Sequence, residues 1–296
     1  MNSSTGKTAT HFIAINYHGF HDVNAALECV QSVLVSAKNL TGEIRITLFN
    51  HSDSPAPPEL STALTTMNVE LANYPESPNG ESLNHQLDQA KGYDFFYRVD
   101  ADDLVSKGRF GWQSALMENT GCDICGGGLI YHNIVTASEH QVLPPEHPGT
   151  MAYLLNHYFL HPTVAYRMSA FNRVNLRYSN RRLEDKCLAL SACKSGLKVV
   201  NDQKIYGTYN LNPNARNAPL FARRNRALNM AFIRTTHSYW AFPLAYGMFA
   251  VSMLFSQDRL RTIRKTLFHR SKADPAVNSE FSCGNAKAGK ARPPSS

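Results

Sequence analysis

The chain has 296 residues, long enough to bury a sizeable core in one large domain or in one domain with an appendage. Hydrophobic residues make up 43% of it and charged residues 18%, a balance that excludes wholesale disorder. The net charge of +7 comes from the end of the chain, because residues 1–215 carry 16 Lys and Arg against 20 Asp and Glu, and residues 216–296 carry 14 against 3. A nucleic-acid binder usually carries its basic face on the folded module, so we expect no nucleic-acid partner.

Strand and helix signals alternate over the first hundred residues. Short apolar runs predict strands, and apolar residues three or four apart predict helices. In chain order we expect a strand at 12–16, a helix at 22–38, a strand at 44–49, a helix at 59–66, a strand at 68–71, a helix at 79–90 capped by Gly92, and a strand at 93–99. This order predicts βαβ units, and therefore an α/β fold with a mostly parallel central sheet.

The second half of the chain is less regular. We expect a strand at 123–131, whose glycines 126–128 indicate either a bulge or a close approach to the backbone. A helix is expected at 182–195, with Gly196 at its end. The resulting organisation is a flexible N-terminus at 1–10, one α/β domain at 11–215, a helical basic extension at 216–270 and a disordered tail at 271–296.

Polar clusters follow three of the predicted strands, at 16–18, 50–53 and 100–103. Ligands of open parallel sheets gather at the carboxyl ends of the strands. The cluster at Asp100, Asp102 and Asp103, called here the acidic loop, is the strongest signal. Three carboxylates in four residues repel one another unless a cation or solvent relieves them, and oxygen ligands of this kind suit Mn²⁺ or Mg²⁺ beside substrate phosphates. The alternative is an exposed acidic turn.

Two further candidates are weaker when taken alone. Glu184 and Asp185 open a helix, where carboxylates either complement the helix dipole or serve as a general base. His161 precedes a proline, which fits a plain loop as well as a binding site.

The spacing of the six cysteines is not typical of a disulfide framework. Cys122 and Cys125 form one C-x-x-C pair, but no second pair of zinc ligands stands at the spacing that a zinc site needs. We therefore expect buried thiols in a reducing compartment. The polar N-terminus has no apolar signal region, which favours the cytoplasm.

Several motifs stand in an order typical of one enzyme family. They are Phe-Ile-Ala-Ile-Asn-Tyr-His at 12–18, Ile-Thr-Leu-Phe-Asn-His-Ser-Asp-Ser at 46–54, Asn-Gly at 79–80 with Asn84, Ala-Lys-Gly-Tyr-Asp-Phe-Phe-Tyr-Arg-Val-Asp-Ala-Asp-Asp at 90–103, His-Pro-Thr at 161–163 and Leu-Glu-Asp at 183–185. Over residues 11–212 the chain resembles family 2 glycosyltransferases of the GT-A fold. The resemblance implies that residues 11–215 form a catalytic domain with a nucleotide-binding GT-A-like sheet and a C-terminal helical extension.

The resemblance also implies a role for each matching residue. Asp185 would be the catalytic base with Glu184 beside it. Asp102 would bind the metal, with Asp100 and Asp103 in the same shell. His161 and Arg167 would lie on the acceptor side. The donor would meet Asn16, Tyr17, Asp53, Asn79, Gly80, Asn84 and Asp100.

The activity implied is metal-dependent transfer of a sugar, with inversion, from a nucleoside-diphosphate sugar to an acceptor hydroxyl. A UDP-sugar is the favoured donor. The acceptor would be a saccharide or a lipid-linked one in cell-surface polysaccharide or glycolipid assembly. The chain lacks the Q-x-x-R-W motif of processive synthases, so addition of a single sugar is expected.

The basic extension favours attachment to a membrane surface. Residues 239–255 are 17 residues without a charge, interrupted by Pro243 and Gly247, and basic residues alternate with apolar ones over 258–270. We expect a peripheral location on the cytoplasmic face of the inner membrane. The alternative is that these segments are helices packed on the catalytic domain.

Two other functions fit parts of the pattern. A sugar nucleotidyltransferase could use the same acidic loop, although no Gly- and basic-rich activating loop stands near the N-terminus. A non-catalytic, transferase-like membrane assembly partner is the other, although a scaffold has no need of the acidic loop and of Glu184 and Asp185.

Overall fold

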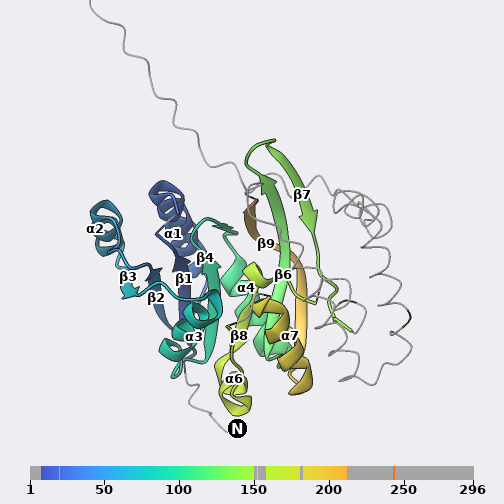
Figure 1. The fold of residues 1–296 in the computed structure, drawn as a ribbon. Coiled ribbons are helices and arrows are strands. Elements are labelled where there is room, and N and C mark those ends of the chain that lie inside the picture. The colour runs from blue at the N-terminus through green and yellow to red at the C-terminus, as the bar shows by residue number, and fades with distance from the viewer. Residues whose placement is uncertain are drawn as a thin grey trace, which may run out of the picture. The chain divides into compact units, whose positions relative to one another are not determined.

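The first strand sets the layers of the fold, because its side chains alternate between two apolar cores. Ile13 and Ile15 belong to one core, Phe12 and Ala14 to the other, and all four are fully buried. A strand buried on both faces needs helices on both faces. The computed structural model describes residues 8–19, 21–149, 152, 158–180, 183–211 and 243, which all lie in one compact unit (Figure 1).

The helices and strands follow the alternation expected from the sequence. The helices are α1 (Val23–Ala37), α2 (Pro58–Thr66), α3 (Asn79–Gln89), α4 (Arg109–Thr120), α6 (Met168–Val174) and α7 (Glu184–Lys194), with a 3₁₀ turn at His161–Thr163. The strands are β1 (Thr10–Tyr17), β2 (Glu43–His51), β3 (Glu70–Tyr74), β4 (Phe95–Asp100), β5 (Leu104–Val105), β6 (Ile124–Asn133), β7 (Ser138–Val142), β8 (Ala165–Arg167) and β9 (Val199–Leu211).

One sheet contains all of these strands, in the order β3-β2-β1-β4-β8-β6-β9-β5, with β7 on the side of β6 (Figure 1). The first four strands pair in parallel, as do β6 and β9. The short strand β8 is antiparallel to both β4 and β6, so it joins the two parallel parts. Helices α1, α2 and α4 cover one face, and α3, α6 and α7 cover the other. The predicted α/β fold with a mostly parallel sheet is confirmed.

Local details differ from the prediction in two places. Gly92 does not cap α3, because that helix ends at Gln89 and Ala90 is its C-terminal cap. The third strand begins at Glu70, because Asn68 has a φ of 55° and belongs to the preceding turn.

The glycine-rich strand β6 contains a β-bulge. The pairing of β6 with β9 shifts register on both sides of Gly128. A Cβ atom on Gly127 would lie 2.4 Å from the Tyr206 ring, so the backbone is also packed closely against a neighbouring side chain. Both features have a structural explanation.

Cys122 and Cys125 are buried free thiols, as expected, and burial raises the pKa of both. Residues 1–7 of the predicted flexible N-terminus at 1–10 lie outside the described residues, and Thr10 already belongs to β1. The extension at 216–270 apart from residue 243, and the tail at 271–296, also lie outside them. Within the described part of the chain, no helix combines the length and apolar character needed to span a bilayer.

Candidate active site

Parallel strands bring the polar clusters of the sequence to one edge of the sheet. Asn16 at the end of β1 lies opposite Asp100 at the end of β4, and Tyr17 lies opposite Asn50 of β2. The predicted gathering of these clusters at the carboxyl ends of the strands is confirmed.

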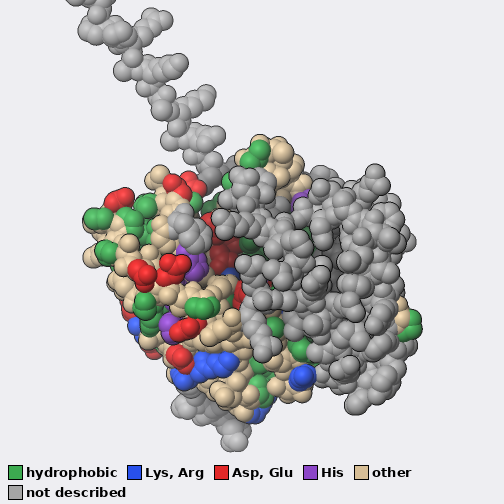
Figure 2. All heavy atoms as spheres, viewed as in Figure 1, with side chains coloured by type: hydrophobic (Ala, Val, Ile, Leu, Met, Phe, Trp, Pro, Cys, Tyr) green, Lys and Arg blue, Asp and Glu red, His purple; other side chains and the backbone are tan. Residues whose placement is uncertain are grey.

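A cavity of about 860 Å³ opens at this edge. Its size is near the upper end of the roughly 300–1,000 Å³ typical of small-molecule sites. Figure 2 shows acidic side chains in a hollow of the surface. The described residues that line the cavity are Asn16, His18, His21, Glu76, Ser77, Asn79, Arg98, Asp100, Asp102, Tyr131, Tyr158, Phe159, Leu160, His161, Pro162, Leu183, Glu184, Asp185, Lys186, Ala189 and Tyr209.

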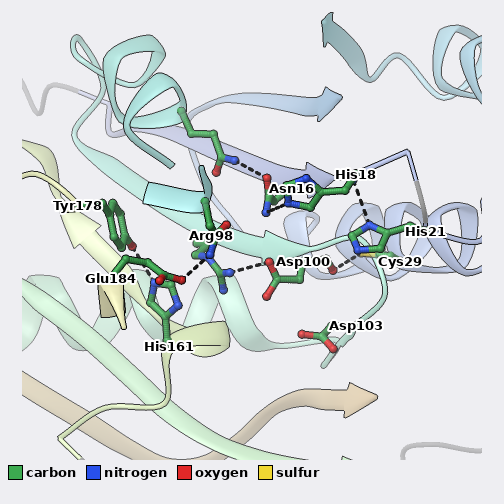
Figure 3. Close-up of polar contacts among 12 residues, drawn as sticks. Asn16, His18, His21, Cys29, Arg98, Asp100, Asp103, His161, Tyr178 and Glu184 are labelled. Carbon is green, nitrogen blue, oxygen red and sulfur yellow. Dashed lines mark hydrogen bonds and ion pairs between the residues drawn. The ribbon is translucent and has the colours of Figure 1, made fainter. Parts of the chain in front are cut away.

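The three carboxylates of the acidic loop have different surroundings, and Figure 3 shows two of them, Asp100 and Asp103. Asp100 forms an ion pair with Arg98, with 2.6 Å between Oδ1 and Nη2. Asp103 is buried outside the cavity lining, and its Oδ1 accepts a hydrogen bond from the backbone N–H of Asn210 at 3.2 Å. Asp102 lines the cavity. The part of the chain that the structure describes contains no group of three His, Cys, Asp or Glu side chains placed to hold one metal ion.

Burial disfavours the charged form of the carboxylates in the acidic loop. It raises the pKa of Asp102, and the charge of Asp100 adds to the rise. The pKa of Asp103 lies well above its ordinary value for the same reasons. The second oxygen of Asp103, Oδ2, is buried without a hydrogen-bond partner among the described residues. A cation near Asp102 would relieve these charges.

Glu184 and Asp185 reach the cavity at the start of α7. Glu184 accepts a hydrogen bond from the Asn79 side chain, and burial raises the pKa of Glu184. Asp185 also lines the cavity. Leu183, which precedes them, has a φ of 70°. A left-handed conformation costs a branched residue roughly 1–2 kcal/mol, and such strain often occurs at functional sites.

The start of α3 holds the segment that leads to α7. The Asn84 side chain accepts a hydrogen bond from the backbone N–H of Tyr178 and donates one to its carbonyl, both at 2.9 Å. A Cβ atom on Gly80 would lie 2.1 Å from the carbonyl oxygen of Ser179. Asn79 lines the cavity, but Gly80 and Asn84 do not. The prediction that these two residues touch the donor is therefore corrected, because they hold a chain segment in place.

His161 lines the cavity, as expected for a substrate-facing residue. Its Nε2 atom lies 2.9 Å from the Tyr178 hydroxyl, which in turn bonds the buried Tyr166 hydroxyl. Burial lowers the pKa of His161 well below its ordinary value, and the charge of Arg98 lowers it further. The imidazole is therefore neutral near pH 7.

Three predicted site residues lie elsewhere. Arg167 pairs with Phe95 at the start of β4 and donates to the carbonyls of Met117 and Cys122, so its prediction as an acceptor-side residue is wrong. Tyr17 is buried in the core and donates to the His21 carbonyl at 3.3 Å. Asp53 accepts from the backbone N–H of Glu76 at 3.0 Å and supports the rim without lining the cavity.

The structure adds cavity residues that were not among the predicted site residues. They include His18, His21, Arg98, Tyr131 and Tyr209. Arg98 is 4% exposed, and its Nε and Nη1 atoms have no partner among the described residues. The sequence does offer a signal for Arg98, because it is a charged residue inside an apolar strand. The two tyrosines look like ordinary strand residues and carry no such signal.

Known structures share this fold. No protein-family model matches the chain, and no curated protein sequence does either. The chain is similar to the crystal structure of the glycosyltransferase TarS of S. aureus, with a TM-score of 0.55 and 13% identity over 74% of this chain and 39% of that one. It is also similar to S. aureus TarS 1–349 in complex with UDP-GlcNAc, with a TM-score of 0.55 and 15% identity over 76% of this chain and 66% of that one. The chain thus spans well under half of the longer TarS chain, and the likeness shows a glycosyltransferase-like fold.

Proposed function

We propose that the chain is an inverting glycosyltransferase of the family 2, GT-A type, which moves a sugar from a nucleoside-diphosphate sugar to an acceptor hydroxyl. The observation that carries the proposal is one cavity lined both by Asp102 of the acidic loop and by Asp185 of α7. These two carboxylates are 83 positions apart in the chain, and the fold brings them to one space. The similarity to TarS supports the same conclusion at the level of fold.

The donor diphosphate would bind at the acidic loop together with Mn²⁺ or Mg²⁺. The residues present fit such an ion, because the Asp102 carboxylate faces the cavity and the buried Asp103 Oδ2 lacks a partner among the described residues. Mg²⁺ is usually held by one or two carboxylates plus substrate phosphates, so three convergent side chains are not required. When bound, the ion would neutralise the departing diphosphate. Asp100 would contribute less directly, because Arg98 already holds it.

Asp185 would act as the general base. Its carboxylate would accept the proton of the acceptor hydroxyl as that oxygen bonds to the anomeric carbon. The bond from this carbon to the diphosphate oxygen breaks in the same displacement, which inverts the configuration. A positioned base contributes roughly 10² to 10⁴ in rate. Glu184 would position the start of α7 through its hydrogen bond with Asn79.

A UDP-sugar is the proposed donor, since one of the similar structures is a UDP-GlcNAc complex. We further propose that the protein works in cell-surface polysaccharide or glycolipid assembly, peripheral to the cytoplasmic face of the membrane. The basic composition of residues 216–270 supports that location.

Calorimetric titration with UDP, GDP and dTDP, each with Mn²⁺ or with EDTA, tests the donor half of the proposal. One nucleotide is expected to bind only with metal, and Asp102→Ala is expected to abolish that binding. Glu118→Ala is the matched control, because it removes an exposed carboxylate of α4 that does not line the cavity. Folded protein that binds none of the three nucleotides would contradict the proposal.

A further inference from the structure

One wall of the cavity is aromatic and was not identified by any motif. Tyr131 of β6 and Tyr209 of β9 are partners in the register of these parallel strands. Their ring centroids are 5.4 Å apart, and the rings meet edge to face at 62°. Both side chains line the cavity.

The tyrosine pair is held firmly from behind. Both rings pack against a buried cluster of Leu129, Val142 and Leu160. Tyr131 also stacks on His140, with centroids 5.2 Å apart and 15° between the ring planes. Rings fixed in this way can bind a ligand with little loss of side-chain entropy.

The pair shares the cavity lining with both groups of carboxylates. Burial, Asp103 and Asp185 together raise the pKa of Tyr131 to about 12. After burial, the charges with the largest effect on the pKa of Tyr209 are those of the acidic loop. A molecule lying on this wall would therefore stand beside both the proposed base and the proposed donor site.

The two hydroxyls remain available for binding. Neither the Tyr131 hydroxyl nor the Tyr209 hydroxyl makes a hydrogen bond with another residue in the described ranges. Each side chain therefore offers an apolar ring and a polar tip to the cavity. A pyranose has the matching surface, because its C–H groups form an apolar face and its hydroxyls lie around the edge.

We propose that Tyr131 and Tyr209 form a saccharide-binding subsite that holds the acceptor sugar ring with one hydroxyl directed at Asp185. The inference rests on the proposed function and names its acceptor class. A long lipid chain fits the site less well, because the cavity next to the tyrosines is lined by charged residues, including Asp102, Glu184 and Asp185. The cavity volume of about 860 Å³ also leaves room for an acceptor beside a donor.

Saturation-transfer NMR on the full chain tests the subsite, with Mg²⁺ and UDP present. The probes are the methyl pyranosides of glucose, galactose, mannose and N-acetylglucosamine, with octyl phosphate as the lipid-like probe. At least one pyranoside is expected to receive saturation, mainly at the C–H groups of one ring face. Tyr131→Ala and Tyr209→Ala should each weaken its binding by roughly tenfold, near the upper end for one aromatic contact. The Phe variants should retain most of it.

Controls separate this inference from the proposed function. Tyr93→Ala removes a half-buried tyrosine before β4 that does not line the cavity, and it should leave pyranoside binding unchanged. Metal-dependent UDP binding is measured on the same samples. If UDP binds but no pyranoside does, if the Ala variants bind pyranosides like wild type, or if only octyl phosphate binds, the subsite is refuted while the donor half of the function stands. Tyrosine-dependent pyranoside binding without nucleotide binding would support the subsite and count against the transferase.

Discussion

The cavity has two sides that are built in different ways. The strand-edge side lies at the ends of β1, β2 and β4, and its residues stand at or directly after the ends of buried strands. The far side comes from the paired strands β6 and β9 and from the start of α7, and the segment before α7 is held by contacts with α3. The strand-edge side is rich in histidines and carboxylates, whereas the far side combines an aromatic wall with the proposed base. In the proposed function, donor binding and proton removal therefore depend on separate parts of the fold.

Of the effects expected from that separation, the largest is the loss of turnover caused by the Asp185→Asn substitution. Removing the proposed base should lower turnover by roughly 10² to 10⁴. Metal-dependent UDP binding should stay at the wild-type level, because the change is on the far side. Single-turnover kinetics and calorimetry on the same sample measure the two quantities. Turnover near the wild-type rate would remove Asp185 from the mechanism, and lost UDP binding would show that the two sides are not independent.

At the strand-edge side, a buried histidine should make the free energy of unfolding depend on pH. Burial and the charges of His18 and His85 lower the pKa of His51 to about 4, against an ordinary 6.5. The unfolded chain therefore binds a proton on His51 more readily than the folded chain between pH 6.5 and 4. The contribution to the free energy of unfolding is complete above pH 6.5 and falls by about 3 kcal/mol as the pH falls to 4. Asp102 and Asp103 act in the opposite direction, because their raised pKa values favour proton uptake by the folded state.

A variant isolates the His51 contribution from those of the other titrating groups. His51 stacks with both Phe49 and Tyr74, so His51→Phe keeps an aromatic ring in this cluster and removes the titration. The stability of the variant relative to wild type should rise by about 3 kcal/mol between pH 7.5 and pH 4. Urea unfolding at several pH values measures this difference. A difference that stays constant with pH would mean that His51 is not held neutral by the fold.

The far side should be sensitive to changes in its support from α3. In Gly80→Ala the new methyl group would overlap the Ser179 carbonyl, which is backbone and cannot rotate away. We expect a loss of about 1–3 kcal/mol in the free energy of unfolding, typical of overpacking. We also expect lower turnover with UDP binding retained, since the displaced segment leads to α7. Gly92→Ala is the matched control, because no atom lies within 4 Å of its Cβ position, and it should change stability by less than about 0.5 kcal/mol. Equal effects in the two variants would contradict the proposed support.

The same contrast explains what the sequence could predict. The strand-edge side was predictable because its residues follow buried strands directly, and parallel strands must end at one edge. The roles of Gly80, Asn84 and Arg167 could not be read from spacing, because each depends on a contact at least 45 positions away. The tyrosines of the far side were missed because strand periodicity does not show which face of a strand lines a cavity. Leu183 is a further case, since its left-handed φ is set by the surrounding fold.

The smallest expected effect is at a side-chain contact that joins the two sides. The Asn210 side chain at the end of β9 donates a hydrogen bond to the Asp102 carbonyl at 2.6 Å. Asn210→Ala should cost about 1 kcal/mol, the usual contribution of one hydrogen bond. Because the bond fixes the backbone of the acidic loop, metal-dependent UDP binding should weaken by roughly fivefold, which corresponds to the same free energy. Asn172→Ala, an exposed asparagine of α6, should leave that binding unchanged. Calorimetry on the two variants measures whether the Asn210 hydrogen bond supports UDP binding. Unchanged binding in Asn210→Ala would mean that the acidic loop is held by its own strand. The far side would then contribute nothing to donor recognition.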